Sequence, residues 1–96
     1  MFAWDIDEAI TNFEKHGVPF EEAATIFGDP DGLDWLDKAH SHDALRFKRL
    51  GRSLTGCILL VVYTIRTTND DKETIRIIGA RSASRKERKA YARPTD

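Results

Sequence analysis

The sequence predicts a single α+β domain, residues 1–96, with helices near both ends and strands between them. Three observations support this class. Apolar residues recur at helical spacing over the first 28 residues, several later stretches have the composition of strands, and a serine and a glutamate at capping-box spacing begin a basic C-terminal segment. A chain of this length buries one modest core, so a second domain is not expected.

Two helices are expected in the N-terminal third. Asp5 and Glu8 have the spacing of a capping box, apolar residues follow at positions 6, 9, 10 and 13, and Gly17 ends the run. Pro19 is a favourable first residue for a second, shorter helix, which Gly28 would end. The following DPDG segment then turns the chain.

Strands are expected over residues 33–37, 44–50, 57–65 and 73–80. The first two alternate apolar and polar residues, whereas the run CILLVVYTI is apolar and β-branched on both faces, as a covered central strand is. Short loops make consecutive strands antiparallel, which predicts an antiparallel sheet of about four strands. Ser82 or Ser84 would cap a last helix over residues 85–92, and Ser84 and Glu87 have capping-box spacing.

The composition also argues against several classes of protein. The longest apolar run, residues 57–63, is too short to span a bilayer, and the acidic N-terminus is unlike a signal peptide, so a cytoplasmic protein without membrane attachment is expected. A single cysteine, Cys57, supports neither a disulfide framework nor a thiolate zinc site. His40 and His42 form a weak pair that is expected to be solvated, so neither a metal nor a cofactor is predicted.

The charges are divided unevenly along the chain. Residues 1–45 carry two basic and eleven acidic side chains, whereas residues 46–96 carry thirteen basic and five acidic ones, although the whole chain has a net charge of −1. Such a division is typical of a surface that binds a polyanion. It equally fits two halves that attract each other within one fold, and the sequence does not choose between these interpretations.

Strand parity places several arginines on defined faces. Arg76 alternates with isoleucines in a nearly apolar strand, so its charge requires an internal carboxylate or a polar pocket. Arg66 shares a parity with Thr64 on the neighbouring strand. Arg46 and Lys48 share a parity on the strand before it, and a basic surface forms across the sheet if these two pairs fall on one face. Arg81 has the opposite parity to Arg76, so both serve one site only if the strand bulges or ends near Gly79.

Four segments carry a resemblance to a known family: WDIDEAITNFEKHGVPFEEAATIFGDP, RFKRLGRS, GCILLVVYTIR and IRIIGARSASRKERKAY. Together they cover nearly the whole chain and resemble the BrnT family of toxins from type II toxin–antitoxin systems. The resemblance implies a RelE-like fold, with two N-terminal helices and a small antiparallel sheet, and an endoribonuclease that inhibits translation. It also implies a BrnA-like antitoxin as partner, which neutralises the toxin and itself binds operator DNA.

Two positions depart from the pattern of this family. Ala44 and Leu45 stand ahead of Arg46 where acidic residues are expected, and Asp43 is the nearest carboxylate that could substitute. Gly79 stands where serine is usual, a smaller change that mainly affects the backbone. A carboxylate that serves as base or orients Arg46 would therefore be missing from this chain.

The chemistry of metal-independent RNA cleavage selects candidate catalytic residues. With the RNA 2′-hydroxyl as nucleophile, the protein takes one proton, gives another and stabilises a phosphorane with extra negative charge. Arginine suits the stabilisation because its fork matches phosphate oxygens and stays charged, which selects Arg46, Arg76 and Arg81. His16 and Tyr91 are the candidates for proton transfer.

Further basic residues are predicted to bind the RNA: Lys15, Lys48, Arg52, Arg66, Arg85, Arg88 and Lys89. Plainer interpretations stay open, because His16 suits a helix C-terminus, Tyr91 suits packing, and the RKERK run suits a solvated helix face. A non-catalytic module that binds nucleic acid or a protein partner therefore remains as the alternative function. The missing acidic residues favour this module, whereas the intact IRIIGAR segment favours the ribonuclease.

Overall fold

The structure is a computed structural model that describes residues 1–93. Its elements are, in chain order, β1 (Phe2–Ala3), α1 (Ile6–His16), α2 (Phe20–Thr25), the 3₁₀ turn η1 (Ile26–Gly28), β2 (Leu33–Leu36), the 3₁₀ turn η2 (Lys38–His40), β3 (Phe47–Arg52), β4 (Ile58–Thr67), β5 (Glu73–Ser82) and α3 (Arg85–Tyr91). The α+β class predicted from the sequence is confirmed.

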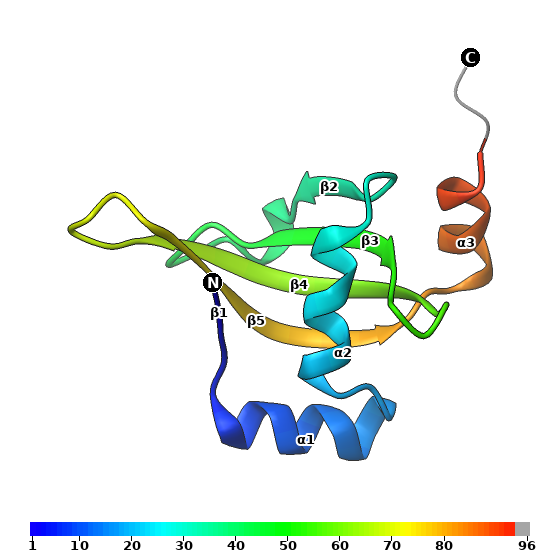
Figure 1. The fold of residues 1–96 in the computed structure, drawn as a ribbon, viewed down its shortest axis with the longest axis horizontal. Helices are drawn as coiled ribbons and strands as arrows, with labels where there is room; N and C mark the ends of the chain where they lie inside the picture. The colour runs from blue at the N-terminus through cyan, green and yellow to red at the C-terminus, as the bar shows by residue number, and fades with distance from the viewer. Residues whose placement is uncertain (94–96) are drawn as a thin grey trace.

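Five strands form one sheet in the order β1-β5-β4-β3-β2 (Figure 1). Consecutive strands from β2 to β5 pair antiparallel, as predicted, but β1 adds a fifth strand parallel to β5. The prediction of an antiparallel sheet of about four strands was therefore wrong in this detail, and the sheet is mixed. The reason is that β1 has only two residues, and so short a strand has no readable periodicity.

The helix termini use the residues that the sequence indicated. Asp5 accepts hydrogen bonds from two backbone N–H groups in the first turn of α1, and Gly17 ends this helix with a φ of 72°. The second predicted helix is divided, because α2 stops at Thr25 and a 3₁₀ turn continues the coil. Ser84 and Glu87 form the predicted capping box of α3.

The main core lies between α2 with η1 and one face of the sheet, which α2 crosses in Figure 1. Its largest fully buried side chains are Phe20, Ile26, Leu59, Val61 and Ile77. A smaller cluster on the opposite face packs beside α3 and contains Leu50, Leu60, Ala83 and Tyr91. The first half of β4 is thus covered on both faces, as predicted, whereas its last residues are exposed.

A β-bulge in β5 changes the parity of its arginines. Tyr63 of β4 lies opposite Ile77, but the preceding Val62 lies opposite Gly79, so Ile78 is an extra residue. Arg76 and Arg81, opposite Thr64 and Leu60, consequently share one face of the sheet. The bulge near Gly79 that a shared site requires is therefore present.

Candidate functional site

A hollow of about 540 Å³ lies between the β2–β3 loop and the neighbouring parts of β4 and β5. Three arginines from three different segments line it: Arg46, Arg66 and Arg76. The loop adds His40, His42 and Asp43 to the lining, together with Ala44 and Leu45. The fold thus gathers three of the arginines that the sequence selected for catalysis or RNA binding.

Arg76 has both of the surroundings that its strand position required. Its Nη2 donates to Oε1 of Glu8 in α1 at 3.2 Å, and its side chain also lines the hollow. This contact is single and both side chains stay partly exposed, at 32% for Arg76 and 42% for Glu8. Water therefore screens the pair strongly, and the guanidinium keeps donors for a further anion.

The β2–β3 loop is closed by hydrogen bonds that set the position of Arg46. The backbone N–H of Asp37 donates to the carbonyl of Arg46 at 2.8 Å, and the Ser41 hydroxyl donates to the carbonyl of Asp37 at 2.6 Å. The same hydroxyl accepts the N–H of Arg46 at 3.0 Å. These bonds hold residues 44–46 in the loop, so β3 begins at Phe47 and not at Ala44 as predicted. Within residues 1–93, neither Arg46 nor Arg66 forms an ion pair.

The same loop contains a contact that the sequence interpretation missed. Nδ1 of His40 lies 3.0 Å from Oδ2 of Asp37, and Lys48 approaches the same oxygen at 4.0 Å. Asp37 is 8% exposed, whereas the His40 side chain is 65% exposed. The signal in the sequence was an aspartate three residues ahead of a histidine, a spacing that becomes meaningful only because a 3₁₀ turn joins the two.

Arg81 shares the face of Arg76 but does not line the hollow. Its two terminal nitrogens donate to the two carboxylate oxygens of Glu87 at 2.8 and 3.0 Å. The hydrogen bond from Arg81 lowers the pKa of Glu87 to about 2, and the same bond raises the pKa of Arg81. A catalytic role for Arg81 stays a prediction, and it requires that substrate compete with this bidentate partner.

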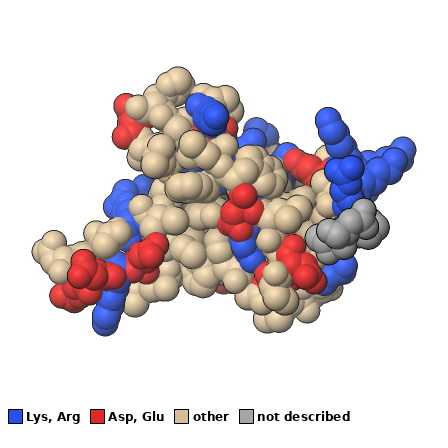
Figure 2. Space-filling view, turned by 90° about the horizontal axis from the view of Figure 1, so that it is seen from above, with Lys and Arg blue, Asp and Glu red and all other residues tan. Residues whose placement is uncertain are grey.

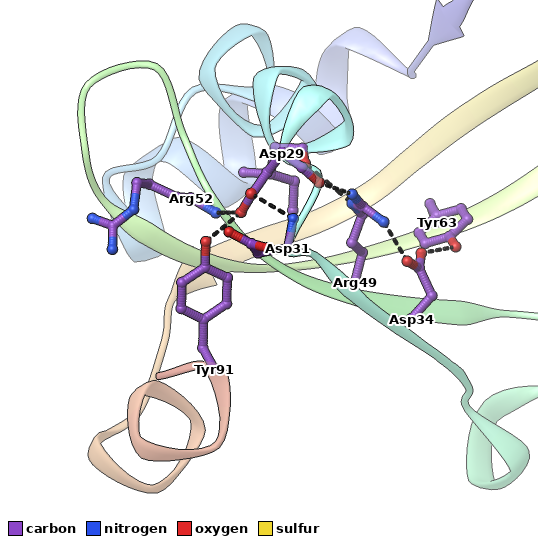
Figure 3. A network of polar contacts seen from close by, with 8 residues as sticks. Asp29, Asp31, Asp34, Arg49, Arg52, Tyr63 and Tyr91 are labelled. Carbon is purple, nitrogen blue, oxygen red and sulfur yellow. Dashed lines mark hydrogen bonds and ion pairs between the residues drawn. The ribbon is translucent and has the colours of Figure 1, made fainter. Parts of the chain in front are cut away.

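Tyr91 belongs to a polar network on the side of α3, shown in Figure 3. Its hydroxyl donates to Oδ2 of Asp29 at 2.5 Å, and the backbone N–H of Arg52 donates to the same oxygen at 2.8 Å. This hydrogen bond to a carboxylate raises the pKa of Tyr91, although a role in proton transfer needs a lowered one. The Arg52 guanidinium lies 5.7 Å from the Tyr91 ring centre. These contacts support the packing interpretation of Tyr91.

The network continues through Arg49 toward the middle of the sheet (Figure 3). Arg49 donates to the carbonyls of Ile26 and Asp29 and pairs with the carboxylate of Asp34. Tyr63 also donates to Asp34, at 2.5 Å, and burial with this bond raises the pKa of the tyrosine. These groups tie η1, β2, β3 and β4 together and are structural.

Lys15 and His16 lie at the end of α1, in a shallow depression beside the arginine hollow. They line it with Glu8 and Asn12, and Ile78 lines both depressions. His16 is exposed and has no carboxylate at ion-pair distance within residues 1–93. The structure therefore places His16 next to the hollow but not in it, and its catalytic role stays a prediction.

A second group of cations lies on α3, where Figure 2 shows basic side chains gathered at one end of the molecule. Its exposed members are Arg85, Lys86, Arg88 and Lys89, and all of them except Lys86 were predicted to bind RNA. Lys48 lies on the hollow side instead, opposite Val62 of β4. The residues predicted to bind RNA are thus divided between the surroundings of the hollow and the region of α3.

Some of the acidic side chains of the first half form ion pairs with basic side chains of the second half inside the fold. Three ion pairs join an acid of the first half to a base of the second: Glu8 with Arg76, Asp34 with Arg49, and Asp37 with Lys48. Attraction between the two halves is confirmed for these pairs, and binding of a polyanion by the remaining cations stays a prediction.

No helix of residues 1–93 has the length and apolar character needed to cross a membrane. Within the same residues, no three His, Cys, Asp or Glu side chains are grouped so that they could hold a metal ion.

Comparison with known proteins defines the class to which this fold belongs. The family model of BrnT, described as the ribonuclease toxin of a type II toxin–antitoxin system, matches residues 4–87. The 1.1 Å crystal structure of the Brucella abortus ribonuclease toxin BrnT aligns with a TM-score of 0.63 and 23% identity, over 88% of this chain and 99% of that one. Curated protein sequences gave no match.

The structural similarity shows that the fold is that of a small α+β ribonuclease toxin. The chain belongs to the BrnT family of ribonuclease toxins of type II toxin–antitoxin systems, because the family model covers most of its length. The resemblance seen in the sequence is thereby confirmed. Membership of a type II system implies an antitoxin partner.

Proposed function

We propose that this chain is an endoribonuclease that cleaves RNA in the hollow lined by Arg46, Arg66 and Arg76, with the RNA 2′-hydroxyl as nucleophile. The observation that carries the proposal is that three arginines from three segments line one hollow. Two of them have no ion-pair partner within residues 1–93, and the third has a single, screened one.

Arginines suit this reaction because its barrier is dominated by charge on phosphorus. Attack of the 2′-oxygen gives a phosphorane with one more negative charge than the bound phosphodiester. A guanidinium stays protonated at every working pH and offers two parallel donors to phosphate oxygens. The three arginines therefore stabilise the transition state without requiring a metal ion.

Basic residues outside the hollow would guide the RNA strand into it. Lys48 lies on the same face, and the exposed cations of α3 offer backbone contacts farther along. Lys15 at the end of α1 offers a contact on the other side of the hollow. Such contacts bind RNA irrespective of its sequence.

The biological setting follows from the family. Cleavage of messenger RNA in the cytoplasm would inhibit translation, and an antitoxin of the BrnA type would neutralise the chain. Operator DNA would be bound only through that antitoxin. This assignment is supported by the match of residues 4–87 to a toxin of type II systems.

The test is incubation of the purified chain with total RNA in EDTA, followed by analysis of the fragment ends. We expect 5′-hydroxyl and 2′,3′-cyclic phosphate ends from the wild type, and a loss of cleavage of about 100-fold or more in Arg76→Ala, since one lost donor to a developing oxyanion costs this much. Lys72→Ala, which removes an equal charge outside the hollow, is the matched control and should cleave normally. Cleavage that requires a divalent ion would contradict the mechanism.

A non-catalytic RNA-binding module is the second candidate, favoured by Ala44 and Leu45 in the hollow where the family resemblance implies acidic residues. In this case the chain would retard RNA in a gel, with strong salt dependence, and leave it intact. A mobility-shift gel run beside the cleavage assay separates the two functions.

A further inference from the structure

The β2–β3 loop presents an imidazole and a carboxylate in contact beside the arginine hollow. Nδ1 of His40 lies 3.0 Å from Oδ2 and 3.3 Å from Oδ1 of Asp37. A carboxylate can only accept a hydrogen bond, so the contact places the proton of the neutral imidazole on Nδ1. The lone pair is then on Nε2, and a group with a free lone pair can take a proton from a substrate.

Hydrogen bonds within the loop fix the backbone of both residues of this pair. Asp37 is nearly buried, and its backbone N–H and carbonyl are bonded to the carbonyl of Arg46 and the hydroxyl of Ser41. His40 follows in the same 3₁₀ turn, with its own N–H directed to the carbonyl of Asp37 at 3.4 Å. The carboxylate is therefore a fixed anchor, while the imidazole is exposed at the hollow.

The charged groups around the pair favour an anionic substrate beside it. Lys48 of β3 lies 4.0 Å from Oδ2 of Asp37, the same carboxylate oxygen that Nδ1 of His40 contacts. The hollow that His40 lines contains His42, Asp43 and Arg46 from the loop, Arg66 from β4 and Arg76 from β5. A phosphodiester bound by these arginines would place its neighbouring ribose within the hollow that the imidazole lines.

We propose that His40 is the catalytic residue that takes the proton of the RNA 2′-hydroxyl and that Asp37 is its positioning residue, an assignment that rests on the proposed ribonuclease function. The 2′-oxygen forms a bond to phosphorus as its proton passes to Nε2 of His40. The bond from phosphorus to the 5′-oxygen breaks, and that oxygen leaves with the electron pair and takes a proton from solvent water. The imidazolium then returns its proton to solvent, which leaves a 2′,3′-cyclic phosphate and a 5′-hydroxyl.

The two proton-transfer candidates from the sequence are less well placed for this role. His16 lies outside the hollow and has no carboxylate at ion-pair distance within residues 1–93. Tyr91 donates its hydroxyl proton to Asp29 on the α3 side. His40 has both the position and an orienting carboxylate.

The experiment compares single-turnover cleavage by the wild type, His40→Ala, Asp37→Asn and His42→Ala in EDTA between pH 5 and pH 9. We expect His40→Ala to be slower by about 100-fold or more and to lose the dependence of the rate on pH that a general base produces. Added imidazole should restore part of its rate. Asp37→Asn should lower the rate of cleavage at saturating RNA and leave the binding of 2′-O-methyl RNA unchanged, because it removes the anchor of the imidazole and no contact with the RNA.

Two controls separate catalysis from binding and folding. Binding of 2′-O-methyl RNA, which has no nucleophile, should be equal in the wild type and in His40→Ala. His42→Ala removes an imidazole from the same loop that has no carboxylate contact within residues 1–93, and it should not respond to added imidazole. His40→Gln provides a second variant with a side chain of similar size, and it should be as slow as His40→Ala.

The outcomes distinguish this proposal from the proposed function. If His40→Ala and His40→Gln cleave at the wild-type rate, the His40 assignment is overturned and the ribonuclease stands. Imidazole that restores His42→Ala and not His40→Ala overturns it as well, because the base is then the neighbouring histidine. If the wild type leaves RNA intact, the proposed function fails and the assignment of His40 fails with it.

Discussion

Arg76 and Arg81 lie five residues apart on the same face of β5, but their carboxylate partners differ. Glu87 binds Arg81 through both oxygens, whereas Glu8 binds Arg76 through one. A bidentate pair holds its guanidinium more firmly than a single contact. At the scale of single residues, the local partner therefore decides which arginine is available to a substrate.

The pair of Arg81 and Glu87 gives a pH-dependent contribution to stability. Because Arg81 holds the pKa of Glu87 at about 2, below its unfolded value, the contribution is present above the unfolded pKa and is lost as the pH falls toward 2. We expect Glu87→Gln to lower the free energy of unfolding by about 1 kcal/mol at pH 7, a figure that allows for solvent screening. Glutamine keeps the capping-box spacing of α3, so the loss reports the charge.

The measurement is urea unfolding at pH 7, pH 4 and pH 2.5, followed by tryptophan fluorescence. The difference between wild type and Glu87→Gln should shrink as the pH falls. Glu14→Gln, at an exposed position of α1 with no ion pair within residues 1–93, is the matched control and should show no comparable effect. A difference that persists undiminished at pH 2.5 would contradict the assignment to this ion pair.

At the scale of elements, α1 supplies hydrogen-bond partners to the part of β5 that β1 does not reach. The pairing of β1 with β5 reaches only Ile75 and Arg76. Farther along, the Asn12 side chain donates to the carbonyl of Ala80 at 2.8 Å and accepts its N–H at 3.1 Å. One amide side chain thus replaces a strand partner and attaches α1 to the sheet.

Asn12→Ala is expected to cost about 1–3 kcal/mol of stability, because it leaves the backbone N–H and carbonyl of the buried Ala80 without partners. Urea unfolding measures the loss, and amide hydrogen exchange at Ala80 should accelerate. Thr11→Ala, one residue earlier on the same helix, is the control. Wild-type stability in Asn12→Ala would show that this contact is dispensable.

The bulge of β5 is also an element-scale feature. A Cβ added to Gly79 would lie 3.7 Å from Oδ1 of Asn12, an ordinary contact distance. The glycine is therefore not required by space at this position. A serine, which the family resemblance implies here, would therefore place its Cβ at an ordinary contact distance from Asn12.

At the scale of the whole molecule, the hollow and α3 form two separate basic regions. If α3 guides the RNA strand, the double variant Arg85→Ala and Lys89→Ala should weaken RNA binding and flatten its salt dependence by about 0.7 per lost phosphate contact on a log–log plot. Cleavage at saturating RNA should change much less than affinity. Fluorescence anisotropy with 2′-O-methyl RNA between 50 and 200 mM salt, a range over which such contacts weaken clearly, gives the slopes. An unchanged slope would show that α3 does not contact RNA.

The fold was largely predictable because its signals are local. Helical spacing, the caps at Asp5 and Ser84, and the apolar run of β4 are properties of neighbouring residues, and each produced the expected element. The two-residue β1 was missed because its pairing with β5 depends on residues more than seventy positions away.

The site was only partly predictable, because its residues meet through the fold. Arg46 and Arg76 were selected from the sequence and line one hollow, whereas Tyr91 lies in the network around Asp29. His40 was dismissed as a solvated loop residue, since nothing in its immediate neighbours shows that Asp37 is buried beside it. Burial is a property of the assembled chain and cannot be read from spacing.

The sequence by itself determined the class of fold, the family and the residue types that can bind a phosphodiester. Local periodicity and motifs depend only on residues that are close together in the chain, so they can be read without the structure. The tertiary structure decided which of these residues act together. It brings Arg46, Arg66 and Arg76 to one hollow, engages Arg81 with Glu87, and sets a nearly buried Asp37 against His40. The physical reason is that charge pairing and solvent exposure depend on distances across the sheet, which only the folded chain defines.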